Sequence, residues 1–210
     1  MCGISGVLSF DGKYNKEDVL KMNKILSHRG PDDEGTYFDE FIGLGHRRLS
    51  IIDLSKTGHQ PMSCGPERYW IIFNGEVYNY LEIREDLIKY GFNFHSNTDT
   101  EVVLKSYIKW GKDCLKKFNG MWAFAIWDNV KKELFCARDR FGVKPFYYYH
   151  EDGYFVFASE IKAILEAEGV PREPNYERIL QYLGNYPLLE NKSTFFKDIF
   201  LNCNMKSRAL

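Results

Sequence analysis

The sequence predicts an α+β protein in which antiparallel sheets are covered by helices. The expected elements run strand, helix, several strands, helices and more strands, without the regular βαβ repeat of a doubly wound fold. The later strands are joined by short connections rich in turn residues, at 128–129, 142 and 152–153, which favours antiparallel pairing. The chain has 210 residues, 44% of them hydrophobic and 16% aromatic, so a sizeable core can form.

In the first half of the chain, hydrophobic periodicity predicts three strands and three helices. The strands are expected at 4–10, 43–53 and 69–73, and the helices at 16–27, 80–90 and 99–110. Thr98 and Glu101 have the spacing of a capping box, so the carboxylate of Asp99 can be explained as a complement to a helix N-terminus. Residues 27–35 have the composition of a loop, which is either a solvated connection or a flap beside a site.

Two turns and the directions of two side chains follow from the same pattern. Asp11-Gly12 is expected to turn the chain after the first strand, and Asn74-Gly75 after the strand at 69–73, because glycine tolerates positive φ. The helix at 80–90 is expected to direct Tyr90 toward the core. Arg48 is expected on one face of the strand at 43–53.

The second half predicts a meander of four strands followed by helices. The strands are expected at 121–127, 133–138, 144–149 and 154–158. Ser159 is expected to cap a helix at 160–167, which would complete the sheets and helices of the domain. Residues 168–175 contain Gly and two prolines and predict a linker, followed by a short helix at 176–183 and a polar tail.

Composition excludes several classes of protein. The formal net charge of −1 does not favour binding to nucleic acid or to an acidic membrane surface. No apolar run is long enough to span a bilayer, and the N-terminus lacks the pattern of a signal peptide. The five cysteines are scattered, without a CxxC pair or nearby histidines at metal-ligand spacing. We therefore expect reduced thiols, a cytoplasmic location and no bound metal.

Cys2 is the candidate nucleophile. Cysteine is small enough for Met1 to be removed, which would place a thiol and a free α-amine on one residue. Their unperturbed pKa values lie close together, at about 8.5 and roughly 7.7–8.0, so the amine can serve as the base for the thiol. Any protein can begin Met-Cys, however, and Cys2 gains its meaning from the rest of the chain.

Seven stretches in order along the chain resemble the glutamine-hydrolysing domain of class II glutamine amidotransferases, which are N-terminal-nucleophile hydrolases. Within that family the resemblance is to the glutamine-hydrolysing asparagine synthetases, favoured by Pro31-Asp32 and by Asn-Gly-Glu-Val-Tyr-Asn at 74–79. The seven stretches are 1–4, 28–32, 46–53, 74–79, 98–101, 138–145 and 157–160.

The resemblance implies a four-layer α/β/β/α sandwich of two antiparallel sheets, and it implies site residues. Cys2 would attack the side-chain amide of L-glutamine, while the Asn74 amide and the Gly75 backbone N–H would bind the oxyanion. Arg48 would bind the substrate α-carboxylate, and Asp99 with Glu76 its ammonium. Backbone groups of the segment Leu49, Ser50, Ile51 and Ile52 would line the same pocket. Taken singly, each residue also has a simpler explanation: Arg48 as a surface cation, Asp99 as a helix cap, Asn74-Gly75 as a turn.

The resemblance also implies domains and partners. Residues 1–168 would form the glutaminase domain, 169–175 a linker, and 176–210 the truncated start of a synthetase-like domain or a tail, whose deletion from 175 onward should cost little stability. A synthetase domain or subunit would accept the ammonia, and ATP and Mg²⁺ would bind there, with no cofactor in this chain. The helix at 176–183 would fray, dock loosely on the glutaminase domain or bury its apolar face against a second chain. If Met1 is retained, the alternative is a non-catalytic glutamine-binding module.

Overall fold

Two antiparallel sheets stacked face to face form the centre of the protein. The computed structural model describes residues 1–10, 14–64, 67–184 and 192–202. One sheet has six strands in the order β10-β8-β9-β1-β3-β2, and the other has four in the order β4-β5-β6-β7. The strands are β1 Gly3–Ser9, β2 Asp33–Phe38, β3 Ile42–Arg48, β4 Met62–Cys64, β5 Tyr69–Val77, β6 Gly120–Asp128, β7 Glu133–Arg138, β8 Tyr147–Glu151, β9 Tyr154–Ala158 and β10 Ile199–Leu201.

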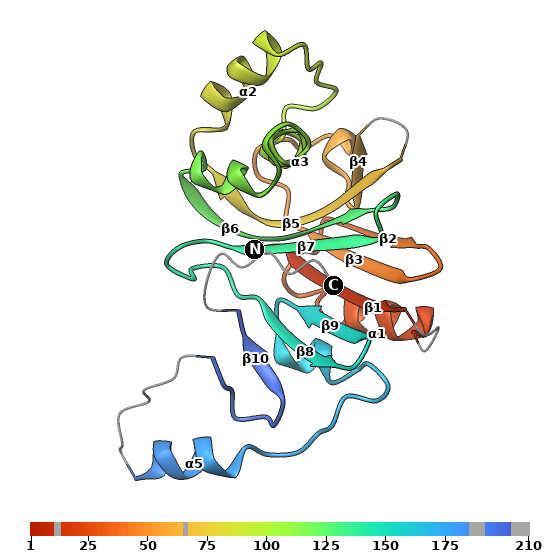
Figure 1. The fold of residues 1–210 in the computed structure, drawn as a ribbon, viewed down its shortest axis with the longest axis vertical. Helices are drawn as coiled ribbons and strands as arrows, with labels where there is room; N and C mark the ends of the chain where they lie inside the picture. The colour runs from red at the N-terminus through yellow and green to blue at the C-terminus, as the bar shows by residue number, and fades with distance from the viewer. Residues whose placement is uncertain (11–13, 65–66, 185–191, 203–210) are drawn as a thin grey trace.

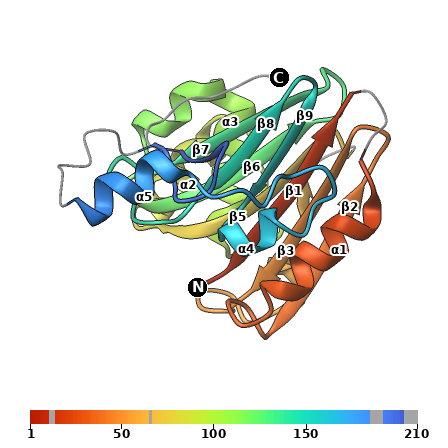
Figure 2. The ribbon, with the colours of Figure 1, turned by 90° about the horizontal axis from the view of Figure 1, so that it is seen from below.

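Helices cover the outer face of each sheet, as Figures 1 and 2 show. One helix packs directly on the four-stranded sheet with a second packed against it, two helices pack on the six-stranded sheet, and the last helix lies at the periphery. The helices are α1 Lys16–Ile25, α2 Tyr80–Lys89, α3 Asp99–Trp110, α4 Ile161–Ile164 and α5 Tyr176–Leu183, with 3₁₀ turns η1 Lys56–Gly58 and η2 Gly111–Lys116. The predicted α/β/β/α order of layers is therefore confirmed.

Strand alternation explains how one chain fills three apolar layers. Along β6, Trp122 and Phe124 contribute to the core beneath α2 and α3, whereas Ala123 and Trp127 contribute to the core between the sheets. The third core lies between the six-stranded sheet and the helices α1 and α4, and it contains Val7 of β1. Because successive strand residues point to opposite faces, sheets that are covered on both sides require these near-continuous apolar runs.

Local chemistry accounts for the helix starts that the sequence predicted. The Asn15 side chain accepts a hydrogen bond from the Glu17 N–H at the start of α1. The Thr98 side chain accepts one from the Glu101 N–H at the start of α3. The Glu101 carboxylate, however, accepts from the N–H groups of His95 and Ser96, so only half of the predicted capping box forms.

Several predicted boundaries in the first half are wrong. Residues 33–35 belong to β2, an edge strand paired with β3, and not to a loop. The strand predicted at 43–53 ends at Arg48. Asn74-Gly75 is not a turn, because β5 continues to Val77 and pairs with β6 throughout. Tyr90 is 58% exposed and contacts Trp110 instead of entering the core.

The second half also differs from the prediction in three places. β7 and β8 belong to different sheets, so the four strands form two hairpins and not one meander. Ser159 caps no helix; its hydroxyl accepts a hydrogen bond from the Ile4 N–H, and α4 is confined to Ile161–Ile164. The sheets are not complete by Ala167, because β10 pairs with β8 and Ile199 is fully buried.

Two predictions fall outside the described residues: the Asp11-Gly12 turn and the end of the polar tail at 203–210. The division of the chain at residue 168 stays a prediction. None of the helices in the described ranges has the length and the apolar character that crossing a membrane requires.

Candidate active site

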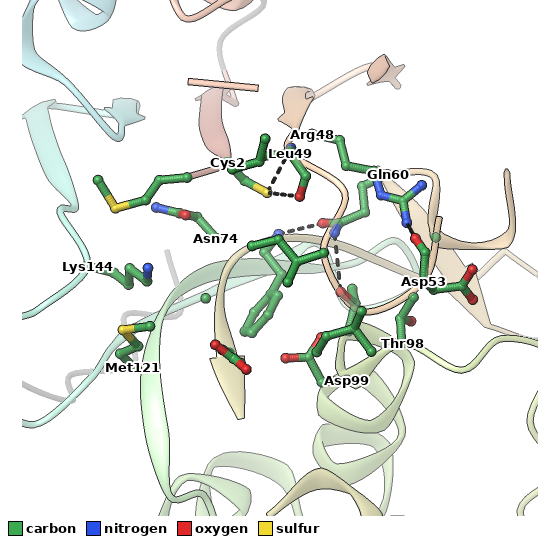
Figure 3. A pocket seen from close by; sticks show the side chains of 18 residues that line it. Cys2, Arg48, Leu49, Asp53, Gln60, Asn74, Thr98, Asp99, Met121 and Lys144 are labelled. Atoms are coloured by element: carbon green, nitrogen blue, oxygen red, sulfur yellow. Dashed lines mark hydrogen bonds between the residues drawn. The ribbon is translucent and has the colours of Figure 1, made fainter. Parts of the chain in front are cut away.

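A cavity of about 270 Å³ lies where Cys2 and the ends of β3 and β5 meet the start of α3 (Figure 3). Its size suits a single small ligand, since drug-sized pockets run upward from about 300 Å³. The residues that line it are Met1, Cys2, Arg48, Leu49, Ile51, Ile52, Asp53, Gly58, Gln60, Phe73, Asn74, Gly75, Glu76, Thr98, Asp99, Thr100, Met121 and Lys144.

Cys2 immediately precedes β1, the strand between β9 and β3, and its sulfur faces the cavity. The Leu49 N–H donates to Sγ at 3.4 Å, and the thiol donates to the Leu49 carbonyl at 3.7 Å. Burial raises the pKa of the Cys2 thiol, while the Leu49 N–H, the terminal ammonium and Arg48 lower it and Asp99 raises it. Forming the thiolate therefore depends on these nearby donors and cations.

Arg48 ends β3 and extends beneath the loop that follows. It is 7% exposed, and its guanidinium donates to the backbone carbonyls of Ser55, at 2.8 Å, and Asp53. Gly58 leaves room for this placement, because a Cβ at this position would displace the guanidinium. A guanidinium has five N–H groups, so Arg48 keeps donors for a ligand after these two bonds.

The Asn74 amide is the most unusual polar group in the cavity. Asn74 is 1% exposed, and its Nδ2 has no hydrogen-bond partner. Figure 3 shows this side chain next to Cys2. Because a buried donor left without a partner costs free energy, roughly 1–3 kcal/mol, this NH₂ group is arranged to bind something that enters the cavity.

The open edge of β5 supplies a second donor. β4 pairs only with the segment before Ile72, so beyond it the outward amides of β5 lack a neighbouring strand. Gln60 Oε1 accepts from the Phe73 N–H at 2.7 Å, and Asp99 Oδ2 accepts from the Val77 N–H at 3.0 Å. Gly75 lies midway between them, so by strand alternation its N–H points the same way, into the cavity.

Replacing Gly75 by a residue with a side chain would produce a steric clash with the neighbouring strand. A Cβ there would lie 2.5 Å from the Met121 carbonyl oxygen and 2.7 Å from Trp122 Cα, both backbone atoms of β6. The glycine therefore serves close packing in a strand and not the positive φ of a turn.

Asp99 is the most buried of the three acidic residues that line the cavity, the others being Asp53 and Glu76. It is 5% exposed, and burial raises the pKa of its carboxyl to about 6, with hydrogen bonds from Val77 and Thr100 opposing the shift and Glu76 adding to it. A carboxylate held above its ordinary pKa is stabilised by any cation that binds beside it.

The loop at 27–35 lies against the site. Arg29 Nε donates to the Cys2 carbonyl at 2.9 Å, and its guanidinium also pairs with Glu160. Asp32 accepts a hydrogen bond from the Ser50 N–H at 2.7 Å. The segment thus lies beside the site, but none of its residues lines the cavity, and residues 33–35 are strand. Whether residues 27–32 act as a flap or as a solvated connection stays a prediction.

Eight of the nine residues predicted from the sequence to bind substrate, together with Cys2, line this cavity. The exception is Ser50, whose amide is bonded to Asp32 outside it. The roles assigned to these residues stay predictions. Gln60 was missed, because no local pattern marks a glutamine that completes a strand edge. Thr100 and Lys144 lie within the stretches 98–101 and 138–145, but their positions in the cavity were not predicted.

In the part of the chain that the structure describes, no group of three or more His, Cys, Asp or Glu side chains is arranged to hold a metal ion.

Comparisons with known proteins give a consistent result. The family model described as "Glutamine amidotransferase domain" matches residues 1–204. A Methanocaldococcus jannaschii protein, provisionally named glutamine-hydrolysing asparagine synthetase 2, is 47% identical over 85% of this chain and 38% of its own length. The glutamine-hydrolysing asparagine synthetase 3 of Bacillus subtilis is 40% identical over 95% of this chain and 33% of its own length.

The chain thus spans about a third of the length of these relatives. Among solved structures, the glutamine phosphoribosylpyrophosphate amidotransferase of Bacillus subtilis matches with a TM-score of 0.66 at 19% identity, covering 79% of this chain and 44% of that one. At this identity the match shows the fold alone.

Proposed function

The chain belongs to the glutamine amidotransferase domain family, and from that premise we propose that it hydrolyses L-glutamine to glutamate and ammonia through a thioester on Cys2. In this proposal Met1 is removed, so that Cys2 carries a free α-amine beside its thiol. The amine, directly or through a water molecule, takes the thiol proton, and the thiolate adds to the amide carbon of the substrate.

Two donors stabilise the resulting oxyanion: the Asn74 NH₂ group and the Gly75 N–H. When the oxyanion collapses, the C–N bond breaks and the protonated amine of Cys2 gives its proton to the departing ammonia. Water then hydrolyses the thioester, which releases glutamate and regenerates the thiol.

The charges of the cavity suit an amino acid. Arg48 binds the α-carboxylate with its remaining N–H groups, and Asp99 with Glu76 binds the α-ammonium. Backbone groups of Leu49, Ile51 and Ile52 line the space between. A zwitterion of glutamine size thereby pairs both of its charges with groups of opposite sign.

The observation that carries the proposal is the buried Asn74 NH₂ group without a partner beside Cys2. The test is a glutaminase assay on the purified chain, with intact-mass spectrometry to establish that Met1 is absent. Cys2→Ala should abolish glutamate release, because Cys2 is the only cysteine among the residues that line this cavity. Full activity in Cys2→Ala would contradict the proposal.

One observation favours a second candidate, a non-catalytic glutamine-binding module. Met1 itself lines the cavity. If it is retained, the Cys2 nitrogen is an amide and cannot act as a base. A chain of unprocessed mass that binds glutamine without turnover would support this second candidate.

We extend the proposal to the fate of the ammonia. An acceptor domain or subunit of the synthetase type would use it, and ATP and Mg²⁺ would bind to that part and not to residues 1–202. We also propose a cytoplasmic location, which is supported by the free thiols of Cys2, Cys64, Cys114 and Cys136; Cys203 lies outside the described residues.

A further inference from the structure

The groups that would perform the reaction are divided between two sheets. Cys2 immediately precedes β1 and Arg48 ends β3, both strands of the six-stranded sheet, whereas Asn74 and Gly75 belong to β5 of the four-stranded sheet. Catalysis by preorganised donors requires that the two sets keep a fixed relative position, because a misplacement of 1 Å can cost about 10²-fold in rate. Something must therefore hold β5 in place next to β3.

Phe73, one residue before Asn74, has both its backbone N–H and its backbone carbonyl bound by side chains. Its carbonyl accepts a hydrogen bond from His46 Nε2 at 3.1 Å. Its N–H donates to Gln60 Oε1 at 2.7 Å, and Gln60 Nε2 donates to Thr100 Oγ1 at 3.2 Å. The first bond joins β5 to β3 of the other sheet, and the second pair joins β5 to the start of α3, beside Asp99.

The state of His46 is set by these contacts. The Phe73 carbonyl can only accept, so Nε2 carries the hydrogen. His46 is fully buried, its Nδ1 has no partner, and burial lowers its pKa to about 4. The ring is thus neutral at working pH and acts as a hydrogen-bond donor only. Gln60 is 5% exposed and is oriented from both ends of its amide.

We infer that His46 and Gln60 are positioning residues for the glutaminase reaction: they hold the backbone of β5 on both sides of Phe73 so that the Asn74 NH₂ group and the Gly75 N–H stay aimed at the oxyanion. The inference rests on the proposed function. Neither residue touches the reacting atoms in the proposed mechanism, so their loss should lower the chemical step and leave the binding charges of Arg48 and Asp99 in place.

The test compares turnover in variants of the processed chain with that in a control matched for structural damage. Gln60→Met removes the acceptor for the Phe73 N–H at nearly constant volume. Trp127→Phe is the control, because the Trp127 Nε1–H also makes a hydrogen bond between the sheets, to Asp39 at 2.7 Å. Its partner on β5 is Trp70, four residues or about 13 Å along the strand from Asn74.

For Gln60→Met we expect kcat for glutamine to fall by about 10- to 100-fold, with KM within about threefold of wild type. Trp127→Phe should lower the thermal midpoint while kcat stays within about twofold. Two variants at His46 give an independent test. His46→Leu should lower kcat, whereas His46→Gln, whose amide N–H can reach the Phe73 carbonyl, should keep most of the wild-type kcat. This pair carries the test if Gln60→Met does not fold.

Two results have different meanings. A processed wild-type chain without glutaminase activity would overturn the proposed function and this inference with it. An active wild-type chain in which Gln60→Met and His46→Leu lose no more turnover than Trp127→Phe, or in which His46→Gln is no better than His46→Leu, would overturn this inference alone.

Discussion

Protonation of Asp99 should control how tightly the cavity binds glutamine. With a pKa of about 6 in the free protein, the Asp99 carboxyl is about 90% ionised at pH 7 and about 10% ionised at pH 5. The glutamine α-ammonium keeps its proton across this range and needs the ionised form. The dissociation constant should therefore rise by about tenfold as the pH falls from 7 to 5.

Calorimetric titration of glutamine into a processed Cys2→Ala chain measures this without interference from turnover. Asp99→Asn should weaken binding at pH 7 and remove most of the pH dependence, because the amide keeps an acceptor for the Val77 N–H but carries no charge. Glu76→Gln is the comparison variant: it should keep a pH dependence, shifted to lower pH, because Glu76 contributes to the raised pKa of Asp99. If the Cys2→Ala chain that retains Asp99 binds glutamine equally well at pH 5 and pH 7, the reasoning is refuted.

The raised pKa of Asp99 affects stability in the opposite direction: low pH weakens glutamine binding but stabilises the free chain. The folded pKa of about 6 lies above the unfolded value of about 3.9, so the free chain is most stable when Asp99 is protonated. That stabilisation is fully present below about pH 4 and is lost as the pH rises through 6; two pKa units correspond to roughly 3 kcal/mol. Asp99→Asn should therefore raise the free energy of unfolding at pH 7, measured by urea titration without glutamine.

Three further predictions separate binding, chemistry and folding. Arg48→Ala should weaken glutamine binding by about 2–5 kcal/mol with a smaller effect on kcat, because it removes the proposed carboxylate partner; an unchanged KM would assign that role elsewhere. Asn74→Ala should lower kcat by about 10²–10³, as loss of an oxyanion donor does, and an effect on KM alone would exclude that role. Ile199→Ala should cost about 2–4 kcal/mol in urea unfolding, since Ile199 is fully buried in β10, and deletion from residue 175 should cost more; a truncated chain of wild-type stability would restore the prediction made from the sequence.

Most of the site, but less of the fold around it, could be predicted from the sequence. Helix α5 and strands β7 and β9 have the predicted bounds, because apolar periodicity and caps are local signals. β2 was missed because Asp33-Glu34-Gly35 is polar, and its strand state comes from pairing with β3. β5 was cut short for a similar reason: Asn-Gly favours a turn locally, while pairing with β6 extends the strand.

Most of the predicted site residues line the cavity although the bounds of their strands were predicted wrongly, because their position in the cavity does not depend on the exact end of a strand. Arg48 was expected inside a strand and instead ends one, yet it still reaches the cavity. Gln60 could not be identified, because its role exists only once the open edge of β5 and the start of α3 lie on either side of it. A residue that completes another element leaves no pattern of its own in the sequence.

The position of β1 bears on the order of events during synthesis. β1 pairs with β9, so the strand that presents Cys2 gains its second neighbour only when residues 154–158 have been made. At about 5–20 residues per second, a ribosome needs roughly 8 to 30 s to pass from β1 to β9. During that interval β1 lacks one of its two neighbours, and Met1 is still 56% exposed once the sheet is complete. An aminopeptidase can therefore reach Met1 both before and after β9 pairs with β1, so the proposed maturation of the nucleophile does not depend on the completion of folding.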